Sequence, residues 1–136
     1  MLWSLNIVPS AAVCASRLLL DRLPTRTNLI RRGVQIGNAL CPLCQKGVET
    51  TQHLFTTCKV TQKVWDQCER WVGNVNVRHE DINIHFQCFH LLSQRQRVNR
   101  AWKVMWVAIM SKIWNHRNKV VFKGGVVDHE EIFSLA

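Results

Sequence analysis

Between residues 41 and 58 the chain carries three cysteines and one histidine at the spacing C-x2-C-x8-H-x4-C. These residues are Cys41, Cys44, His53 and Cys58. Three thiolates and one imidazole complete a tetrahedron around Zn²⁺ and leave no position open for a substrate. We therefore expect one structural zinc ion here. The competing interpretation is a chance match of buried cysteines and a core histidine. Four potential ligands in order over so short a span favour the metal.

The first ligand pair belongs to a tight turn. Cys41 and Cys44 are separated by only Pro42 and Leu43, so both sulfurs can point at one ion. Gly47 follows closely, and we expect it to supply the positive φ that such a turn often needs.

The second ligand pair requires a change of chain direction. Thr50 or Thr51 can cap a short helix that carries His53. Cys58 lies five residues further on, which is off the His53 face of a straight helix. It can join the site if the helix stops near Thr57 and the chain bends back.

The other cysteines and the hydropathy pattern describe a soluble globular chain. Its 136 residues suffice for one modest core, and neither a signal peptide nor an apolar run long enough to span a bilayer is evident. We therefore expect an intracellular protein, nuclear or cytoplasmic, that does not enter membranes. Six cysteines in such a chain argue for metal rather than disulfides. Cys14, Cys68 and Cys88 lie in apolar patterns and are expected to be small buried hydrophobes.

Hydrophobic periodicity predicts a mainly α fold, in which a small zinc-stapled helical domain is followed by a long amphipathic helix. Stop and start signals divide the chain into a zinc-binding domain (1–73), a loop with a short helix (74–97) and an amphipathic segment (98–136). The expected helices span 10–23, 26–32, 59–72, 84–92, 95–119 and 130–135, and Thr25 is expected to cap the second. Val120–Phe122 could prolong the fifth helix or form a short strand before Gly124 and Gly125 break it.

Apolar stripes within these helices predict the core. Four tryptophans (Trp65, Trp71, Trp102 and Trp106) fall on such stripes, so we expect them to pack in the core rather than to stack on bases. The position of Trp114 beside the main stripe leaves its environment open. In the first helix the predicted apolar stripe includes Leu20, and in the second it includes Leu29 and Ile30.

A set of short motifs stands in a fixed order along the chain. The motifs are Leu20-Asp21-Arg22-Leu23-Pro24-Thr25-Arg26, Asn28-Leu29-Ile30-Arg31-Arg32-Gly33-Val34, Cys41-Pro42-Leu43-Cys44, Glu49-Thr50, His53-Leu54-Phe55, Cys58 and Val64-Trp65. Together they resemble one known family, the zinc-binding domain that follows the reverse transcriptase in plant LINE-type (non-LTR) retroelements. The resemblance covers about residues 3–73 and implies the four zinc ligands named above. More weakly, Ile113-Trp114, Arg117-Asn118 and Phe122 look like the linker to a downstream ribonuclease H.

Charge points to a polyanionic partner. The formal net charge is +9, and Zn²⁺ with three thiolates would reduce it to about +8. We expect a non-catalytic module that binds RNA or DNA with little sequence specificity, because no acidic cluster for a two-metal site is present. The side chains expected to contact phosphates are Arg26, Arg31, Arg32, Lys46, Lys59 and Lys63.

Three alternatives remain. In the first, zinc supports an apolar docking surface for a protein partner. In the second, the chain is an inert remnant of a mobile element. In the third, Cys88 acts as a nucleophile with His85 or His90, although no third residue to orient such a pair is evident.

Overall fold

The computed structural model describes residues 9–72, 80–88 and 96–134, and the regular structure in these ranges is helical. The only strand-like pairing in them is an isolated antiparallel bridge between Leu40 and Val48. The predicted mainly α class is therefore confirmed. The helices are α1 (Pro9–Leu19), α2 (Arg26–Arg31), the π-helix η2 (His53–Thr57), α3 (Lys59–Val72), α4 (Ile82–Cys88), α5 (Gln96–Lys123) and α6 (His129–Ser134).

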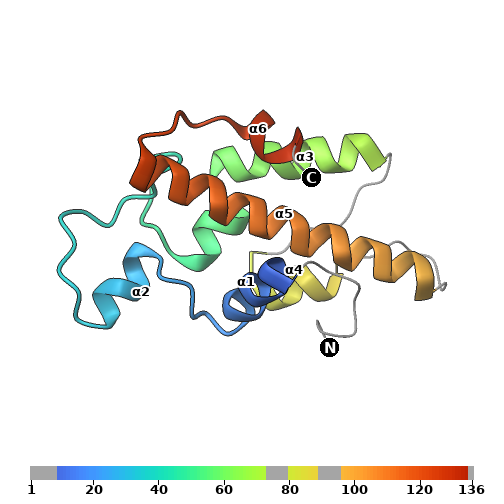
Figure 1. Ribbon diagram of the computed structural model, residues 1–136, viewed down its shortest axis with the longest axis horizontal. Helices are drawn as coiled ribbons and strands as arrows, with labels where there is room; N and C mark the ends of the chain where they lie inside the picture. The colour runs from blue at the N-terminus through green and yellow to red at the C-terminus, as the bar shows by residue number, and fades with distance from the viewer. Residues whose placement is uncertain (1–8, 73–79, 89–95, 135–136) are drawn as a thin grey trace.

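The long helix α5 lies at the centre of the described part of the molecule (Figure 1). It packs against α1 on one side and against α6 on the other, and α6 also packs against α3. Trp106 on α5 is fully buried, which confirms its predicted place in the core, and Ile109 and Ile113 on the same helix are almost completely buried. The helix continues through Val120–Phe122 and ends where Gly124 adopts a φ of 63°.

The first helix ends earlier than predicted. Instead of reaching Leu23, α1 stops at Leu19 because Asp21 adopts a left-handed φ of 53°. The N–H of Arg22 donates to the carbonyl of Arg17 at 2.7 Å, which closes the helix end in a Schellman-type turn. Leu20 therefore leaves the apolar stripe and is 63% exposed, so its predicted burial was wrong.

The corner between α1 and α2 is organised around a buried polar side chain. Asn28 is 4% exposed, and its Nδ2 donates to the carboxylate of Asp21 at 2.9 Å and to the carbonyl of Leu23 at 2.9 Å. Thr25 caps α2 as predicted, because its Oγ1 accepts from the N–H of Asn28. With Asn28 turned inward, Ile30 is 46% exposed, contrary to the predicted apolar stripe.

The tryptophans behave as core residues wherever the structure describes their side chains. Trp65, Trp102 and Trp106 are buried as predicted, and Trp114 is also buried. The side chain of Trp71 lies outside the described residues. Of the cysteines not assigned to the metal, Cys68 is fully buried and Cys14 is partly buried. Burial raises the pKa of the Cys14 thiol to about 11, so this cysteine stays protonated and behaves as a small hydrophobe. The side chain of Cys88 is not described.

Candidate metal centre

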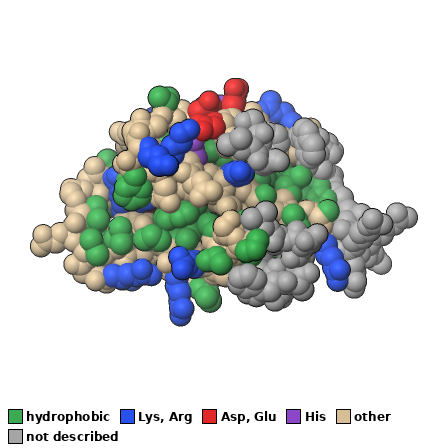
Figure 2. Space-filling view, viewed as in Figure 1, with side chains coloured by type: hydrophobic (Ala, Val, Ile, Leu, Met, Phe, Trp, Pro, Cys, Tyr) green, Lys and Arg blue, Asp and Glu red, His purple; other side chains and the backbone are tan. Residues whose placement is uncertain are grey.

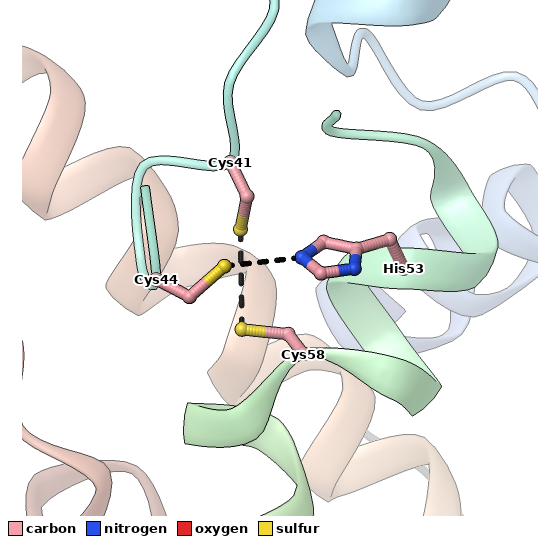
Figure 3. Close-up of side chains that lie close together, drawn as sticks. All are labelled: Cys41, Cys44, His53 and Cys58. Carbon is pink, nitrogen blue, oxygen red and sulfur yellow. Dashed lines mark hydrogen bonds between the residues drawn. The ribbon is translucent and has the colours of Figure 1, made fainter. Parts of the chain in front are cut away.

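The four predicted ligand side chains converge on one point (Figure 3). Their ligand atoms all lie within 4.8 Å of one another. The sulfurs of Cys41 and Cys58 are 3.9 Å apart, and Cys44 Sγ lies 3.2 Å from His53 Nε2. Tetrahedral zinc with Zn–S of about 2.3 Å and Zn–N of about 2.0 Å requires separations of roughly 3.8 and 3.5 Å. The arrangement therefore fits one zinc ion held by four protein ligands.

A short hairpin presents the first two ligands. Leu40 and Val48 form its bridge, and the N–H of Cys41 donates to the carbonyl of Gly47 at 2.7 Å. The chain reverses between Cys41 and Gly47, where the N–H of Gln45 donates to the carbonyl of Cys41 at 2.8 Å. We call residues 40–48 the zinc hairpin.

Gly47 serves this hairpin in a way that the sequence did not reveal. The positive φ expected at Gly47 occurs instead at Gln45, whose φ is 56°. A Cβ at Gly47 would lie 2.9 Å from Cε1 of His53, closer than side chains tolerate. The absence of a side chain at Gly47 thus lets the His53 ring lie against the hairpin backbone.

A π-turn brings the second ligand pair, His53 and Cys58, to the same side of the chain. Thr50 Oγ1 accepts from the N–H of His53 at 3.0 Å, consistent with its predicted capping role. In an α-helix Cys58 would be rotated by about 140° from His53. Instead, the N–H of Cys58 donates to the carbonyl of His53 at 2.7 Å, and Cys58 itself is extended (φ −60°, ψ 135°). The helix stops at Thr57 as predicted, and the wider turn brings Cys58 back to the histidine.

Neighbouring polar groups favour the forms of His53 and Cys58 that bind zinc. Thr57 Oγ1 lies 3.2 Å from His53 Nδ1, so an Nδ1–H donated to this hydroxyl leaves the Nε2 lone pair facing the cysteines. A hydrogen bond donated by the Cys41 thiol, together with the backbone N–H groups of Thr61 and Val60, lowers the pKa of Cys58 to about 5. Cys58 is thus readily a thiolate at the start of α3.

A buried ion pair connects the residue that directly follows the zinc hairpin, Glu49, to α5. Glu49 is fully buried, and its carboxylate accepts from Arg117 Nη2 at 2.7 Å and from Arg117 Nε at 2.8 Å. It also accepts from the N–H of Arg26 at 2.8 Å. The Arg117 guanidinium lies over the ring of Trp114, 4.8 Å from its centroid. Sequence reasoning missed this pair. The signal available was the position of Arg117 four residues after buried Ile113, on the inner face of α5.

The predicted domain boundaries near residues 73 and 97 stay predictions. The ion pair between Glu49 and Arg117 and the packing of α1 against α5 join segments on both sides of those boundaries.

Three predicted phosphate-binding arginines lie on or beside α2, and each has a protein partner. Arg31 is exposed and lies 3.5 Å from the carboxylate of Asp21. Arg32 donates to the carbonyl of Arg22 at 3.2 Å. Arg26 donates through Nη1 to Asn38 Oδ1 at 2.8 Å, among other acceptors. Their role in binding phosphate stays a prediction.

The three predicted lysines lie near the metal centre. Lys46 is on the zinc hairpin, and Lys59 and Lys63 lie in the first turns of α3, directly after Cys58. All three side chains are exposed, and no ion pair of theirs is found within the described ranges. Their surroundings are compatible with phosphate contacts, which stay a prediction.

The histidine proposed as part of a nucleophile pair has a core role. His85 is 4% exposed, and its Nδ1 accepts from Trp106 Nε1 at 2.8 Å. Its ring also packs against Trp65, with ring centroids 4.8 Å apart. His90 and the side chain of Cys88 lie outside the described residues.

A closed site of three cysteines and one histidine, built on a hairpin turn and a helix end, defines a structural zinc domain. Residues 1–65 match the family model described as zinc-binding in reverse transcriptase, and this range includes all four ligands. The match supports a reverse transcriptase zinc-binding domain, which is an accessory domain distinct from the catalytic polymerase domain. No curated protein and no solved structure matches the chain. Over the residues that the structure covers, no helix is both long and apolar enough to cross a bilayer.

Proposed function

We propose that the chain is a zinc-stabilised module that binds RNA or DNA without catalysing a reaction. The observation that carries this proposal is the closed metal site in a segment that matches the family model described as zinc-binding in reverse transcriptase, an enzyme whose substrates are nucleic acids. We extend the proposal to an origin in plant LINE-type retroelements, on the motifs given above, and to a nuclear or cytoplasmic location.

The distribution of charge supports a polyanionic partner. The loaded chain would carry about +8, because Zn²⁺ with three thiolates changes the formal +9 by −1. Figure 2 shows Lys and Arg side chains spread along one face of the molecule, while the acidic side chains on that face gather at the upper edge. Exposed lysines follow directly on the metal site at Lys46, Lys59 and Lys63. When exposed lysines contact the phosphates of a nucleic acid, they release condensed counterions, and this release favours binding.

The burial of aromatic residues supports backbone contacts over base stacking. The described tryptophan side chains are at most 8% exposed, so none of them offers a free ring face for a base. Phosphate contacts position a protein on nucleic acid but carry no sequence information. The proposed binding is therefore weakly sequence-specific.

A fluorescence-anisotropy titration of the zinc-loaded chain tests the proposal. Single-stranded RNA, single-stranded DNA and duplex DNA are titrated at several salt concentrations, with and without a zinc chelator. If about four to six basic side chains engage, log K should fall with log salt at a slope of roughly −3 to −5. Binding no tighter than that of an unrelated protein of equal charge, unchanged by the chelator, would refute the proposal.

A second candidate is a zinc-supported protein-interaction module. The observation in its favour is the apolar surface beyond the metal site, where Phe122 is 75% exposed and Val126 is 82% exposed. An exposed aromatic side chain of this kind is enriched at protein interfaces. This candidate predicts only the weak attraction to nucleic acid that any basic protein shows, so the same titration separates the two. An inert remnant would show neither specific binding nor a dependence on zinc.

A further inference from the structure

A cavity of about 270 Å³ opens between the zinc hairpin and the last turns of α5. Cys41 lies in its wall, yet the metal ligation described above does not use the cavity. In Figure 1 the C-terminal end of α5 lies beside the chain that leads into the hairpin. The volume of the cavity is slightly below the roughly 300–1,000 Å³ of typical small-molecule sites. The cavity therefore suits a ligand of about the size of one nucleotide.

One end of the cavity carries a positive charge that is held in place. Arg26 lines the cavity, and its Nη1 donates to Asn38 Oδ1 at 2.8 Å and to the carbonyl of Leu40 at 3.0 Å. Within the described ranges no carboxylate lies within 4 Å of the guanidinium. Among the residues that the structure describes, this guanidinium makes hydrogen bonds only through Nη1, and its Nη2 and Nε have no partner there. A fixed guanidinium with free donors is suited to a phosphate group.

The remaining walls combine amide groups with an apolar surface. Asn38 and Gln45 add side-chain amides that can hydrogen-bond to a base edge or a sugar hydroxyl. Leu40 and Pro42 from the hairpin form one apolar part of the wall. Val120 and Val121 from α5 form another. A base that enters the cavity would contact these apolar side chains and lose water from the part of its surface that touches them.

We infer that this cavity binds one unstacked nucleotide of a single-stranded nucleic acid, with its phosphate on Arg26 and its base between the hairpin and α5. This inference rests on the proposed function and adds the strand form that the protein prefers. A base within a duplex is stacked and paired, so it cannot enter a cavity of this kind without being extruded. Single strands should therefore bind more tightly than duplexes of equal charge.

A pair of adjacent substitutions tests the inference. Val121→Glu places a carboxylate at the cavity, where it competes with phosphate for Arg26. Phe122→Glu makes the same charge change at the next residue, which is 75% exposed and does not line the cavity. For a labelled 12-nucleotide single strand and the zinc-loaded full chain, we expect Val121→Glu to raise Kd at least tenfold and Phe122→Glu at most twofold. Equal effects of the two substitutions would overturn the inference.

A direct titration covers the case in which Val121→Glu does not fold. The wild-type chain is titrated with adenosine 5′-monophosphate, adenosine or inorganic phosphate and followed by NMR. We expect the nucleotide to shift the Arg26 Nε–H and the Val121 methyl resonances at concentrations at which phosphate alone shifts only Arg26. Unchanged Val121 methyl resonances at saturating nucleotide would overturn the inference.

The two proposals can fail separately. If the wild-type chain binds single strands in a zinc-dependent way but Val121→Glu and Phe122→Glu weaken binding equally, the cavity is excluded and the proposed function stands. If the wild-type chain binds no better than a charge-matched protein, the proposed function fails, and the NMR titration still decides on the cavity.

Discussion

Glu49 and Arg117 are 68 positions apart in the chain, yet they form a two-point ion pair that is almost completely removed from water. Glu49 follows the zinc hairpin directly, and Arg117 lies on α5, beyond the segment that the family model covers. The pair therefore connects the metal centre to a helix that the sequence analysis assigned to a segment outside the zinc-binding domain.

Breaking this pair from one side should be costly. Glu49→Gln leaves the Arg117 guanidinium buried without a counter-charge, so we expect the free energy of unfolding to fall by about 3–5 kcal/mol. Urea denaturation of the zinc-loaded protein measures this loss. Lys119→Met is the control, because its ion pair with Glu131 is half-exposed and should cost about 1 kcal/mol or less. Similar losses for both variants would contradict the role assigned to the buried pair.

The metal content follows from the four convergent ligands. Freshly prepared, reduced protein should carry one Zn²⁺ per chain, and Cys44→Ser should lose it because only three ligands remain. Native mass spectrometry counts the metal directly. Cys14→Ser removes a cysteine outside the cluster and should retain one zinc ion. A wild-type chain that carries no metal would rule out the assigned site.

The glycine in the zinc hairpin should be needed for metal affinity. In Gly47→Ala the new Cβ would lie 2.9 Å from Cε1 of His53, which displaces a ligand ring. We expect the affinity for zinc to fall by roughly ten- to a hundredfold, as for other losses of ligand support. Gly37→Ala is the matched control, because a Cβ there would meet no atom within 4 Å. Competition with a chromophoric chelator gives both affinities, and equal values would show that the close approach has no consequence.

Acidification should loosen the docking of α6 on α5. His116 is 5% exposed, and its Nε2 accepts from the N–H of Asp128 at 3.1 Å, while Glu131 lies 3.6 Å from Nδ1. Desolvation lowers the pKa of His116 below its ordinary value, against the opposing effect of Glu131. The unfolded state thus binds the proton more tightly, so stability is complete above about pH 6.5 and falls as the pH drops below it.

The measurement for His116 is the free energy of unfolding of wild type and His116→Gln between pH 7.5 and 5.5. Other titrations, including that of the zinc ligands, occur in both proteins and cancel in the difference. The wild type should lose more stability over this interval than the variant. A pH dependence that is identical in both would show that His116 does not titrate differently on folding.

Phosphate contacts near α2 should appear in the salt dependence of nucleic-acid binding. Arg31→Ala combined with Arg32→Ala should reduce the slope of log K against log salt by about one per lost contact, and should weaken all sequences alike. Arg70→Ala with Arg100→Ala removes the same charge from exposed positions on α3 and α5. If this control pair changes the slope equally, overall charge rather than a site near α2 drives the binding.

The sequence by itself determined the features that depend on neighbours along the chain. The ligand set and its spacing identified one zinc site, and the apolar periodicity identified the helical class and the stripe that contains Trp106. The need for a bend after Thr57 followed from helix geometry, since five residues do not return to the same helix face.

Only the tertiary structure decided how these pieces meet. Three features depend on groups that local periodicity does not bring together. They are the burial of Asn28 in place of Ile30, the π-turn at Cys58 and the pairing of Glu49 with Arg117. Polar side chains can be buried only where partners from other segments satisfy their hydrogen bonds. Propensity and periodicity depend only on a residue's neighbours in sequence. They therefore predict that a polar side chain is exposed, because they cannot reveal hydrogen-bond partners from distant segments.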